Sequence, residues 1–263
     1  MSGQDKGTAV VTGASSGLGA IYADRLAKQG HDLVLVARRA DRLEALAKDI
    51  RAASGRKVTV IVANLADDGD LRRVEQAISA DDSVSVLVNN AGIGGQAVLA
   101  EADADDAERQ IKVNILALTR LTRAVLPGMI ARDRGAIVNI ASVLAFDVSY
   151  GGIYSGAKAY VVNFTEGLQA ELAGTKVAAQ IVAPGPIRTE FWDVAGASLS
   201  SLPESIIMTG DDLVDAALAG LAKGEGFTAP GLANAEAWDA YKGARNGFYG
   251  QLIAGKPAAR YGV

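Results

Sequence analysis

The sequence predicts an α/β protein of the Rossmann type, with a doubly wound parallel sheet of about seven strands and helices on both of its faces. Short apolar runs alternate with longer amphipathic stretches along the chain. The apolar runs are hydrophobic at nearly every position, as strands of a sheet covered on both faces are. A glycine-rich segment, residues 13–19, joins the first apolar run to the first amphipathic stretch. Together these observations predict strands and helices that alternate along one sheet.

In the first half of the chain, each expected strand is an aliphatic run and each expected helix repeats apolar residues on one face. The first helix ends where Gly30 follows. The apolar face of the second consists of Leu43, Leu46, Ala47 and Ile50. The expected strands are residues 8–12, 32–37, 57–63 and 84–89, and the expected helices are residues 19–29, 42–53 and 71–79.

The second half continues the alternation with a longer helix. Residues 105–132 fit one helix with a distortion near Pro127, because a proline inside a helix removes a backbone hydrogen bond. The other expected elements are strands over 135–141, 176–182 and 227–229 and helices over 154–172 and 212–222. We expect one domain over residues 1–263, with a substrate lid at about 190–210 and a C-terminal extension at about 230–263.

Composition limits the classes of function. The chain has 263 residues, of which 49% are hydrophobic and 21% charged, enough to bury the core of one such domain. The formal net charge is −4 and there is no basic stripe, so we expect no nucleic-acid partner. Cysteine is absent, which excludes disulfides and thiolate catalysis. The one histidine, His31, cannot build a histidine-rich metal site, and we expect it at the surface near the start of a strand.

The sequence gives no sign of secretion or membrane insertion. Met1–Gly7 is polar and lacks the apolar region of a signal peptide. No segment reaches the roughly 18 uninterrupted apolar residues of a membrane helix. We therefore expect a soluble, cytoplasmic protein with no membrane partner.

The carboxyl ends of parallel strands meet at one edge of a sheet, where open α/β proteins bind their ligands. This rule brings widely separated segments together around one crevice. They are residues 13–19, 37–39, 64, 89–92, 142 and 184–189. We expect the functional site at this edge.

Residues 12–19, Thr-Gly-Ala-Ser-Ser-Gly-Leu-Gly, connect the first strand to the first helix. Glycines let the backbone turn tightly and approach a pyrophosphate, and the helix N-terminus offers free amides. The spacing Gly-x-x-x-Gly-x-Gly lacks the Lys-Ser/Thr of a loop that hydrolyses nucleoside triphosphates. A tight turn that binds nothing is the alternative to a dinucleotide site. The expected cofactor contacts are Gly13, Ser15, Ser16, Gly17, Leu18 and Gly19.

The second strand ends in Ala37-Arg38-Arg39. Sites for NAD commonly present an acidic residue there to the ribose 2′-hydroxyl, and Ala37 cannot do so. Arg38 and Arg39 instead suit a 2′-phosphate, because a guanidinium binds phosphate with two hydrogen bonds. The sequence therefore predicts NADP(H) in preference to NAD(H). A solvated basic turn before the next helix is the alternative.

Tyr154 and Lys158 are four residues apart and follow Ser142 in the chain. On a helix they would lie on one face, one turn apart. A neighbouring ammonium favours phenolate, so Lys158 would lower the pKa of Tyr154 from its ordinary value near ~10 toward the range useful for proton transfer. Alone, the pair is also typical of a half-exposed helix face.

In this order and at these spacings, the motifs of the chain resemble those of the short-chain dehydrogenases/reductases, in their compact single-domain branch. The resemblance runs from about Thr8 to Thr189, about two-thirds of the chain. It implies an oxidoreductase that transfers hydride between nicotinamide and a carbonyl or alcohol. The motifs are residues 12–19, Asn89-Asn-Ala-Gly92, Asn114, Ser142, Tyr154-x-x-x-Lys158 and Pro184-Gly-Pro-Ile-Arg-Thr189.

The resemblance implies roles for the catalytic residues. Tyr154 would protonate the carbonyl oxygen during reduction and accept the proton in the reverse reaction, and Ser142 would orient that oxygen. Lys158 would hold the nicotinamide ribose and lower the pKa of Tyr154. Asn114 would bend its helix locally and hold a water in a proton relay to Lys158.

The resemblance also implies further cofactor contacts. Asn89 is expected beside the adenine ribose, and in part as a structural residue. Asn64 stands where the family often has an aspartate that meets adenine, and the tail after Thr189 lacks the family's common glycine-rich final strand. The further contacts are Asn64, Leu65, Asn90, Ala91, Gly92, Pro184, Gly185, Ile187 and Thr189, together with Tyr154 and Lys158.

The lid has few charges, which favours a hydrophobic or aromatic ketone or aldehyde over a polyanionic substrate. Its apolar residues are Phe191, Trp192, Val194, Leu199 and Leu202. The identity of the substrate and the physiological direction stay open. A non-catalytic NADP(H)-binding sensor or scaffold is the alternative function, and a lyase or isomerase with a bound cofactor is a third.

The resemblance further implies association, since the helices containing Asn114 and Tyr154 commonly pair across subunits in this family. The small residues that would permit close packing are Ala117, Ala157, Ala159 and Ala170. We expect a homodimer or a homotetramer with symmetric contacts. The tail would cover the substrate pocket, pack on a partner subunit or complete the core.

Overall fold

The computed structural model describes residues 6–95, 99–148, 152–194 and 198–262. Contacts within the chain divide it into two compact units, Met1–Ala229 and Pro230–Val263. The second unit coincides with the C-terminal extension expected from the sequence. One domain over the whole chain stays a prediction.

The first unit is built on a seven-stranded sheet in the order β3-β2-β1-β4-β5-β6-β9, and all neighbouring strands in it are parallel. The strand order reverses between β1 and β4. The strands are β1 (Thr8–Thr12), β2 (Asp32–Ala37), β3 (Val58–Val62), β4 (Val84–Asn89), β5 (Gly135–Ile140), β6 (Val177–Val182) and β9 (Phe227–Thr228). The Rossmann-type sheet expected from the sequence is confirmed, including its short last strand.

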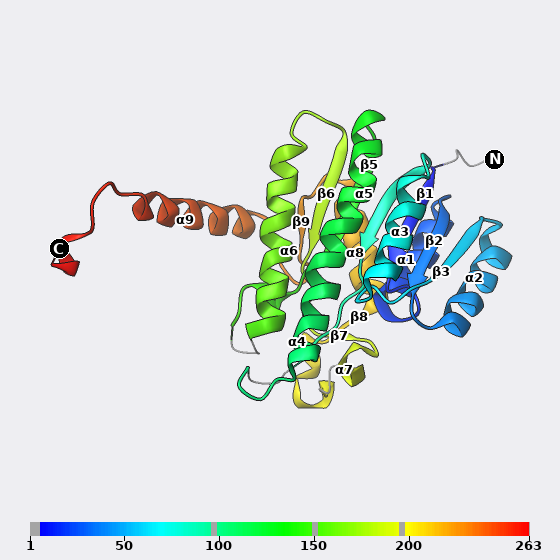
Figure 1. Cartoon of the computed structure of the whole chain (residues 1–263), viewed down its shortest axis with the longest axis horizontal. Coiled ribbons are helices and arrows are strands. Elements are labelled where there is room, and N and C mark those ends of the chain that lie inside the picture. Colours follow the sequence, from blue (N-terminus) through cyan, green and yellow to red (C-terminus); the bar gives the residue numbers. More distant parts are fainter. Residues whose placement is uncertain (1–5, 96–98, 149–151, 195–197, 263) are drawn as a thin grey trace. The chain divides into compact units, whose positions relative to one another are not determined.

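Helices cover both faces of this sheet (Figure 1). One face carries α1 (Gly17–Lys28), α2 (Ala40–Ser54) and α8 (Gly210–Ala222), and the other carries α3 (Asp68–Ser79), α5 (Leu118–Ala131) and α6 (Gly152–Glu171). Beyond the strand ends lie elements that the sequence did not predict. They are the short helix α7 (Phe191–Val194), a two-stranded sheet of β7 (Ile187–Arg188) and β8 (Met208–Thr209), and 3₁₀ turns over Val143–Ala145, Leu199–Ser201 and Glu204–Ile206.

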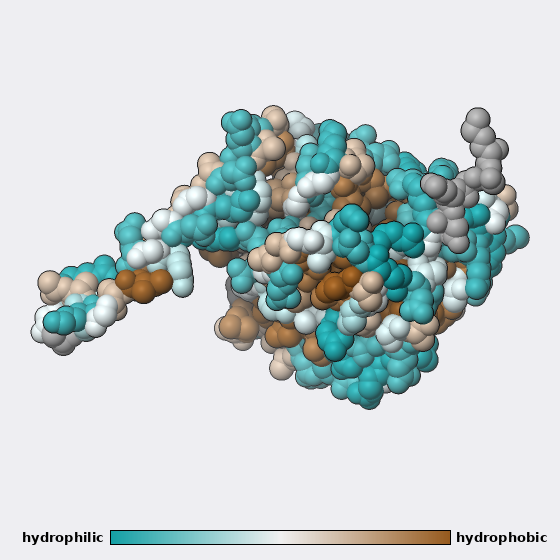
Figure 2. Space-filling model, turned by 90° about the horizontal axis from the view of Figure 1, so that it is seen from above, coloured by the Kyte–Doolittle hydropathy of each residue, from teal (hydrophilic) through white to brown (hydrophobic). Residues whose placement is uncertain are grey.

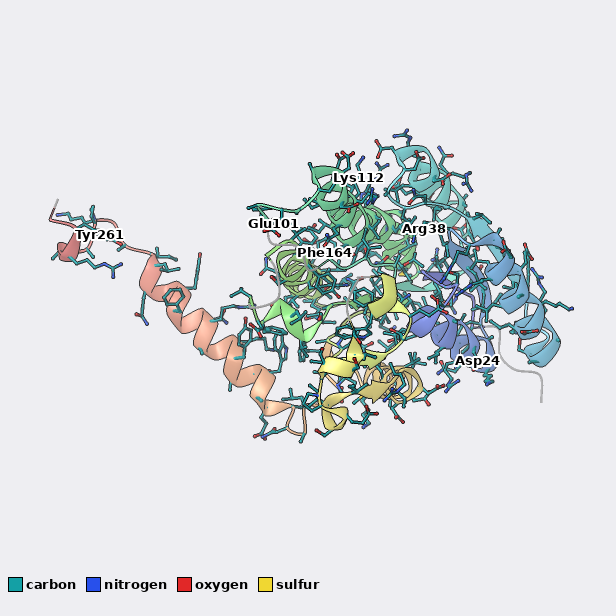
Figure 3. All side chains as sticks on the ribbon, turned by 90° about the horizontal axis from the view of Figure 1, so that it is seen from below. Asp24, Arg38, Glu101, Lys112, Phe164 and Tyr261 are labelled. Atoms are coloured by element: carbon teal, nitrogen blue, oxygen red, sulfur yellow. The ribbon has the colours of Figure 1, made fainter. Side chains whose placement is uncertain are left out.

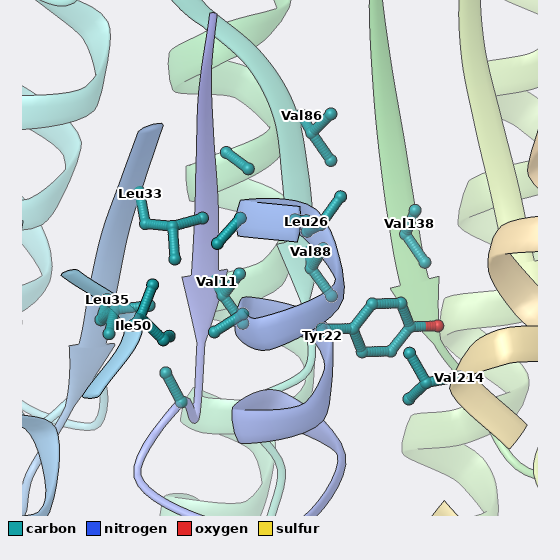
Figure 4. Packing of buried hydrophobic residues seen from close by; sticks show 14 of the residues in the cluster. Val11, Tyr22, Leu26, Leu33, Leu35, Ile50, Val86, Val88, Val138 and Val214 are labelled. Carbon is teal, nitrogen blue, oxygen red and sulfur yellow. The ribbon is translucent and has the colours of Figure 1, made fainter. Parts of the chain in front are cut away.

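Alternate strand residues supply two hydrophobic cores, one under each layer of helices. Leu33 and Leu35 of β2 pack in the core beneath α1 and α2, whereas Val34 and Val36 pack in the core of the opposite face. Figure 4 shows the first core, in which the Tyr22 ring of α1 lies among aliphatic side chains. Because successive strand residues point to opposite faces, each apolar strand serves both cores.

The long helix expected over 105–132 consists of three consecutive segments. They are α4 (Ala104–Ile111), a π-helical turn over Lys112–Ala117, and α5. An irregularity thus lies at the π turn, and α5 continues through Pro127. The expected distortion near Pro127 stays a prediction. The side chains of Val125 and Met129 on either side of Pro127 are buried in the core and hold the helix there.

Asn114 is the polar residue at the centre of this π turn. Its Oδ1 accepts a hydrogen bond from the N–H of Ile93 at 3.0 Å, and its Nδ2 donates to the carbonyl of Ile93 at 2.8 Å. Insertion of an extra residue into a helix commonly marks a functional position. The expectation that Asn114 bends its helix is consistent with this turn.

His31 is buried and not at the surface, so that expectation was wrong. Its Nδ1 lies 3.3 Å from the carbonyl oxygen of Gly7 and 3.3 Å from Oγ of Ser85. These polar groups come from the segments beside the start of β2, and they allow an imidazole to be buried without losing its hydrogen bonds.

Among the described residues, one helical stretch is long and apolar enough to cross a membrane. It is Ala104–Ala131, with 28 residues and a mean hydropathy of 1.2 in its most apolar window. Its residues Leu121, Val125 and Met129 belong to the core beneath the sheet. Of that window, 39% is buried inside the fold, so packing accounts for part of its apolar character.

The second unit contains α9 (Glu236–Leu252) and a 3₁₀ turn over Ala259–Tyr261. The amphipathic segment expected here is thus helical. The Trp238 and Tyr241 rings stack with their centres 5.4 Å apart, as residues three apart on a helix can. The three alternatives for the role of the tail stay predictions.

Candidate active site

A cavity of about 630 Å³ lies at the carboxyl ends of the strands in the first unit. Nearly all residues that the sequence placed in the site line it. They are Gly13, Ser15, Ser16, Gly17, Leu18, Arg38, Arg39, Asn64, Leu65, Asn90, Ala91, Gly92, Ser142, Tyr154, Lys158, Pro184, Gly185, Ile187 and Thr189. Gly19, Asn89 and Asn114 are not among its lining residues.

The loop after β1 and the loop after β4 are tied together where the strand order reverses. The Thr12 side-chain oxygen accepts hydrogen bonds from the backbone N–H groups of Asn90 and Ala91, each at 3.0 Å. The Asn90 side chain donates to the carbonyl of Thr12 at 2.9 Å. Sequence reasoning missed this role of Thr12, whose signal is a polar residue at the end of an apolar strand.

Two glycines of the first loop are required by its geometry. Gly13 has a φ of +67°, which other residues rarely adopt. A Cβ on Gly19 would lie 2.4 Å from the carbonyl oxygen of Gly13 and 2.6 Å from Nδ2 of Asn90. Gly19 therefore allows α1 to pack against the loop, and its expected contact with the cofactor stays a prediction.

The N-terminus of α1 is available to a ligand. The helix begins at Gly17, and Ser16 before it makes no side-chain hydrogen bond to cap the helix. Gly17 and Leu18 line the cavity at this point. Free amides and the helix dipole make such an N-terminus suitable for a pyrophosphate.

Positive charge gathers at the end of the cavity beyond β2. Arg39 donates from Nη2 to Oγ of Ser16 at 2.6 Å and from Nε to Oγ of Ser15 at 3.2 Å. Arg38 is exposed and forms no ion pair with the residues that the structure describes (Figure 3). Ala37 brings no carboxylate to this end of the cavity. The arrangement suits a phosphate monoester better than a ribose hydroxyl.

The other end of the cavity holds Ser142, Tyr154 and Lys158. Tyr154 and Lys158 lie one turn apart on α6, and Ser142 follows β5. The hydroxyl groups of Ser142 and Tyr154 are hydrogen-bonded. The buried Lys158 donates from Nζ to the carbonyl of Ile140 at 2.8 Å. One strand end and one helix face thus position all three side chains.

Burial shifts the two titrating groups in opposite directions. It raises the pKa of Tyr154 to about 12, and the hydrogen bond with Ser142 lowers that pKa only in part. It lowers the pKa of Lys158 from 10.5 to about 8. The expectation that Lys158 brings the pKa of Tyr154 below its ordinary value was wrong for this structure. The removal of the phenolate from water raises the pKa of Tyr154, and the Lys158 ammonium hydrogen-bonds to a backbone carbonyl instead.

Asn114 lies directly behind the catalytic end of the cavity. A Cβ on Gly92 would be 3.2 Å from Oδ1 of Asn114 and 3.6 Å from Nζ of Lys158, so the amide and the ammonium flank the same glycine. The role of Asn114 in a proton relay stays a prediction.

Asn89 belongs to the core and not to the cavity, which corrects its expected place beside the adenine ribose. Its Nδ2 donates to Oγ1 of Thr122 at 3.0 Å and to Oδ1 of Asn139 at 2.9 Å. Asn139 in turn donates to Oγ1 of Thr165 at 2.9 Å. This buried network joins the two central strands to α5 and α6.

The lid expected over 190–210 contributes to the wall of the cavity in part. Its lining residues are Glu190, Phe191, Trp192, Ser198, Ser201, Leu202 and Ile206, and Leu199 is not among them. The side chain of Val194 and residues 195–197 lie outside the described part of the chain. Further lining residues that sequence reasoning missed are Arg109, Val113, Leu144 and Asp147. Their segments carry no motif that would have indicated them.

The fold and the site together define an oxidoreductase of the Rossmann class. The strand order reverses beside a glycine-rich loop, and a serine, a tyrosine and a lysine share the same cavity. A family model described as short chain dehydrogenase matches residues 7–198. The chain belongs to the short-chain dehydrogenase family.

Individual relatives agree with this assignment. A short-chain dehydrogenase from Sphingobium yanoikuyae, solved in complex with NADPH, is 43% identical, with a TM-score of 0.93 over 97% of this chain and 100% of that one. A bulky-bulky ketone specific alcohol dehydrogenase from Comamonas testosteroni is 37% identical, with a TM-score of 0.89 over 97% of this chain and 98% of that one. A probable NADP-dependent dehydrogenase of Haemophilus influenzae is 36% identical over 71% of this chain and 74% of its own length.

Proposed function

We propose that this protein is an NADP(H)-dependent oxidoreductase that transfers hydride between nicotinamide and a hydrophobic ketone or aldehyde, or the matching alcohol. The observation that carries the proposal is the shared cavity, in which Ser142, Tyr154 and Lys158 lie at one end and Arg38 and Arg39 at the other. A site built this way can hold an extended dinucleotide with its reactive ring beside a proton donor.

Features of the chain itself support NADP(H) as the cofactor. The uncapped N-terminus of α1 suits the pyrophosphate, and the positive φ of Gly13 lets the backbone approach it. Arg38 and Arg39 would bind the 2′-phosphate, which NAD(H) lacks. The relatives named for NADPH and for NADP dependence support the same preference.

Bound NADP(H) would supply the hydride to the carbonyl carbon, or accept it from the alcohol. The Ser142 side-chain oxygen accepts the N–H of Leu144 at 3.1 Å. Its hydroxyl, which is hydrogen-bonded to that of Tyr154 in the free chain, would turn to donate its proton to the substrate oxygen. Tyr154, whose pKa is raised to about 12, is protonated at neutral pH and would give its proton to the same oxygen during reduction. Lys158, anchored by the Ile140 carbonyl, would hold the nicotinamide ribose with its remaining N–H groups.

The lining near Tyr154 supports a substrate with apolar substituents. The rings of Tyr154 and Phe191 lie 5.9 Å apart, and those of Phe191 and Trp192 lie 6.3 Å apart at 90°. Leu144, Leu202 and Ile206 are further apolar lining residues. Aromatic and aliphatic walls favour apolar ligands held by few polar groups. The relative named for bulky-bulky ketones supports this class of substrate.

Association into a homodimer or homotetramer in the cytoplasm is part of the proposal. Ala159 and Ala170 of α6 are exposed and can meet a partner, whereas Ala117 and Ala157 are buried inside the chain, a correction to their expected role. Hydrophobic side chains also reach the surface among hydrophilic ones (Figure 2). Light scattering of the purified protein as it elutes from a size-exclusion column would give the number of subunits.

The experiment that tests the function is NADPH consumption by the purified protein with a panel of hydrophobic ketones and aldehydes. NADH and a Tyr154→Phe variant are measured in parallel. Turnover that requires Tyr154 and prefers NADPH is the expected result. Cofactor binding without turnover across the panel would favour the sensor or scaffold, and a preference for NADH would contradict the role given to Arg38 and Arg39.

A further inference from the structure

A carboxylate already lies against the arginines at the adenosine end of the cavity. Glu190 accepts hydrogen bonds from Nη1 of Arg42 at 2.8 Å and 2.7 Å, one on each carboxylate oxygen. It also accepts one from Nη1 of Arg39 at 3.1 Å. The three residues are far apart in the chain, since Arg39 and Arg42 lie at the start of α2 and Glu190 follows β7. Their ion pairs therefore connect the cofactor end of the site to the segment that borders the substrate.

The charges of this cluster are unbalanced. Arg38, Arg39 and Arg42 carry three positive charges within five residues that also contain Asp41, and Glu190 is the carboxylate paired with two of the arginines. The cluster keeps a net positive charge. Its hydrogen bonds with Arg42 and Arg39 lower the pKa of Glu190, so it is ionised at neutral pH. A phosphate monoester carries nearly two negative charges and more acceptor oxygens than a carboxylate. It would therefore neutralise the same arginines more completely.

The ion pairs of Glu190 are also exposed, and exposed ion pairs contribute little to stability. Side-chain exposure is 39% for Arg39, 48% for Arg42 and 49% for Glu190. A bound anion with stronger hydrogen bonds can therefore displace this carboxylate at small cost. A ribose hydroxyl is uncharged and forms weaker hydrogen bonds with arginine, so it would not displace the carboxylate.

The position of Glu190 in the chain gives its displacement a second consequence. The next residue is Phe191, whose ring packs against Tyr154. Trp192 follows, and its Nε1 donates to the carbonyl of Ile187 at 2.8 Å. A shift of the Glu190 backbone is thus transmitted to two aromatic side chains that line the catalytic end of the cavity.

We propose that Glu190 is a specificity-determining residue that competes with the 2′-phosphate of NADP(H) for Arg39 and Arg42. In the free chain its carboxylate holds both arginines, and the phosphate displaces it from Arg39. The displacement repositions Phe191 and Trp192 beside Tyr154. NAD(H) does not displace the carboxylate, so Glu190 strengthens the discrimination between the two cofactors. This inference rests on the proposed NADP(H) function.

The test uses fragments of the cofactor that contain no nicotinamide. Calorimetry measures the dissociation constants of 2′,5′-ADP and 5′-AMP for the wild-type chain, for Glu190→Gln and for Glu204→Gln at one ionic strength. Glu204 is a matched control, because it is an exposed glutamate of the same region that pairs with Arg188. We expect Glu190→Gln to bind 2′,5′-ADP about two- to fivefold more tightly, the range of an exposed ion pair, with 5′-AMP binding unchanged. Glu204→Gln should change neither constant.

The two proposals fail in different ways. If Glu190→Gln leaves the affinity for 2′,5′-ADP unchanged or weakens it, while the wild-type chain still prefers 2′,5′-ADP to 5′-AMP, the competition is wrong and the NADP(H) assignment stands. If neither protein prefers 2′,5′-ADP to 5′-AMP, the NADP(H) assignment falls and this inference falls with it.

Fluorescence tests the link to the catalytic end. The chain has two tryptophans, so Trp238→Phe leaves Trp192 as the single emitter. In that background we expect saturating 2′,5′-ADP to change the Trp192 emission and 5′-AMP to leave it unchanged. In the double variant with Glu190→Gln, the emission of the free protein should already resemble that of the 2′,5′-ADP complex. An emission that 2′,5′-ADP does not alter would overturn the repositioning of residues 191 and 192.

Discussion

Nζ of Lys158 lies 5.6 Å from the centre of the Tyr154 ring, and its hydrogen bond goes to the carbonyl of Ile140. The ammonium of Lys158 is thus close to the phenol of Tyr154, while one of its three N–H groups donates to the backbone. Burial disfavours the charged form of each group, which raises the pKa of Tyr154 and lowers that of Lys158. At neutral pH the phenol keeps its proton, the form that a carbonyl reduction requires.

Removal of the Tyr154 hydroxyl should abolish most turnover without unfolding the site. We expect Tyr154→Phe to lower kcat/KM by a factor on the order of 10²–10⁴, the usual contribution of a positioned proton donor. Tyr160→Phe is the matched control, because Tyr160 is on the same helix and its hydroxyl lies 2.8 Å from Oγ1 of Thr119, away from the cavity lining. Steady-state kinetics of both variants check the prediction, which fails if the two lose activity equally.

The pH dependence of reduction should reflect Lys158 before it reflects Tyr154. The pKa of Lys158 is about 8, so the ammonium loses its proton as pH rises through that value, whereas Tyr154 with a pKa of about 12 stays protonated. We expect kcat/KM for carbonyl reduction to fall above about pH 8. In Lys158→Arg the guanidinium stays charged, and the fall should disappear whatever the absolute rate. A profile of kcat/KM from pH 6 to about 10 measures this, and identical profiles for the two proteins would contradict it.

The sequence predicted the elements that follow local rules. The strands of the sheet are continuous apolar runs, so their positions could be recognised without knowledge of their partners. Many residues around the cavity could be predicted too, because the segments after β1, β2, β4, β5 and β6 follow the carboxyl ends of strands. Tyr154 and Lys158 lie within α6 and were recognised from their own motif, whereas Arg109 and Val113, on the helical stretch before α5, were missed. Gly13 and Arg39 are examples in which residue type and position in the chain were sufficient.

What the sequence did not predict depends on long-range contacts. His31 is buried because Ser85, 54 residues away, supplies a polar partner. The pKa of Tyr154 is set by how deeply the fold buries it, and Tyr-x-x-x-Lys spacing carries no information on burial. Glu190 could not be connected to Arg39 from the sequence, since 151 residues separate them.

The buried charge of Lys158 should reduce the stability of the fold. The pKa of Lys158 in the folded protein is about 8, below its ordinary value of 10.5. Below pH 8, Lys158 is therefore charged in both the folded and the unfolded chain, and burial of the charge lowers the free energy of unfolding by its full amount. Between pH 8 and 10.5 the folded protein has lost the proton that the unfolded chain still binds, so stability rises with pH. We expect Lys158→Met to raise the free energy of unfolding at pH 7 by about 2 kcal/mol, after allowing for the lost hydrogen bond to Ile140.

Urea unfolding of the wild-type chain and Lys158→Met at pH 7 and at about pH 10 measures this difference. The increase in the free energy of unfolding of Lys158→Met over the wild-type chain should be largest at pH 7 and much smaller at pH 10. A variant that is less stable than wild type at pH 7 would show that the ammonium is stabilised in the fold and not penalised.

Substitution of two helical glycines by alanine should have opposite effects on stability, because Gly19 is required by close packing and Gly167 is not. Gly19→Ala would place a Cβ 2.4 Å from the carbonyl oxygen of Gly13, and that backbone cannot yield without deforming the phosphate loop. We expect a loss of about 1–3 kcal/mol in the free energy of unfolding, as in other overpacked sites, together with weaker binding of 2′,5′-ADP. Gly167→Ala lies on the exposed side of α6 with nothing within 4 Å of its Cβ, so it should stabilise the chain by about 0.5–1 kcal/mol and leave binding unchanged. Urea unfolding and calorimetry check both variants, and equal effects on binding would show that the loop does not depend on the close approach of α1.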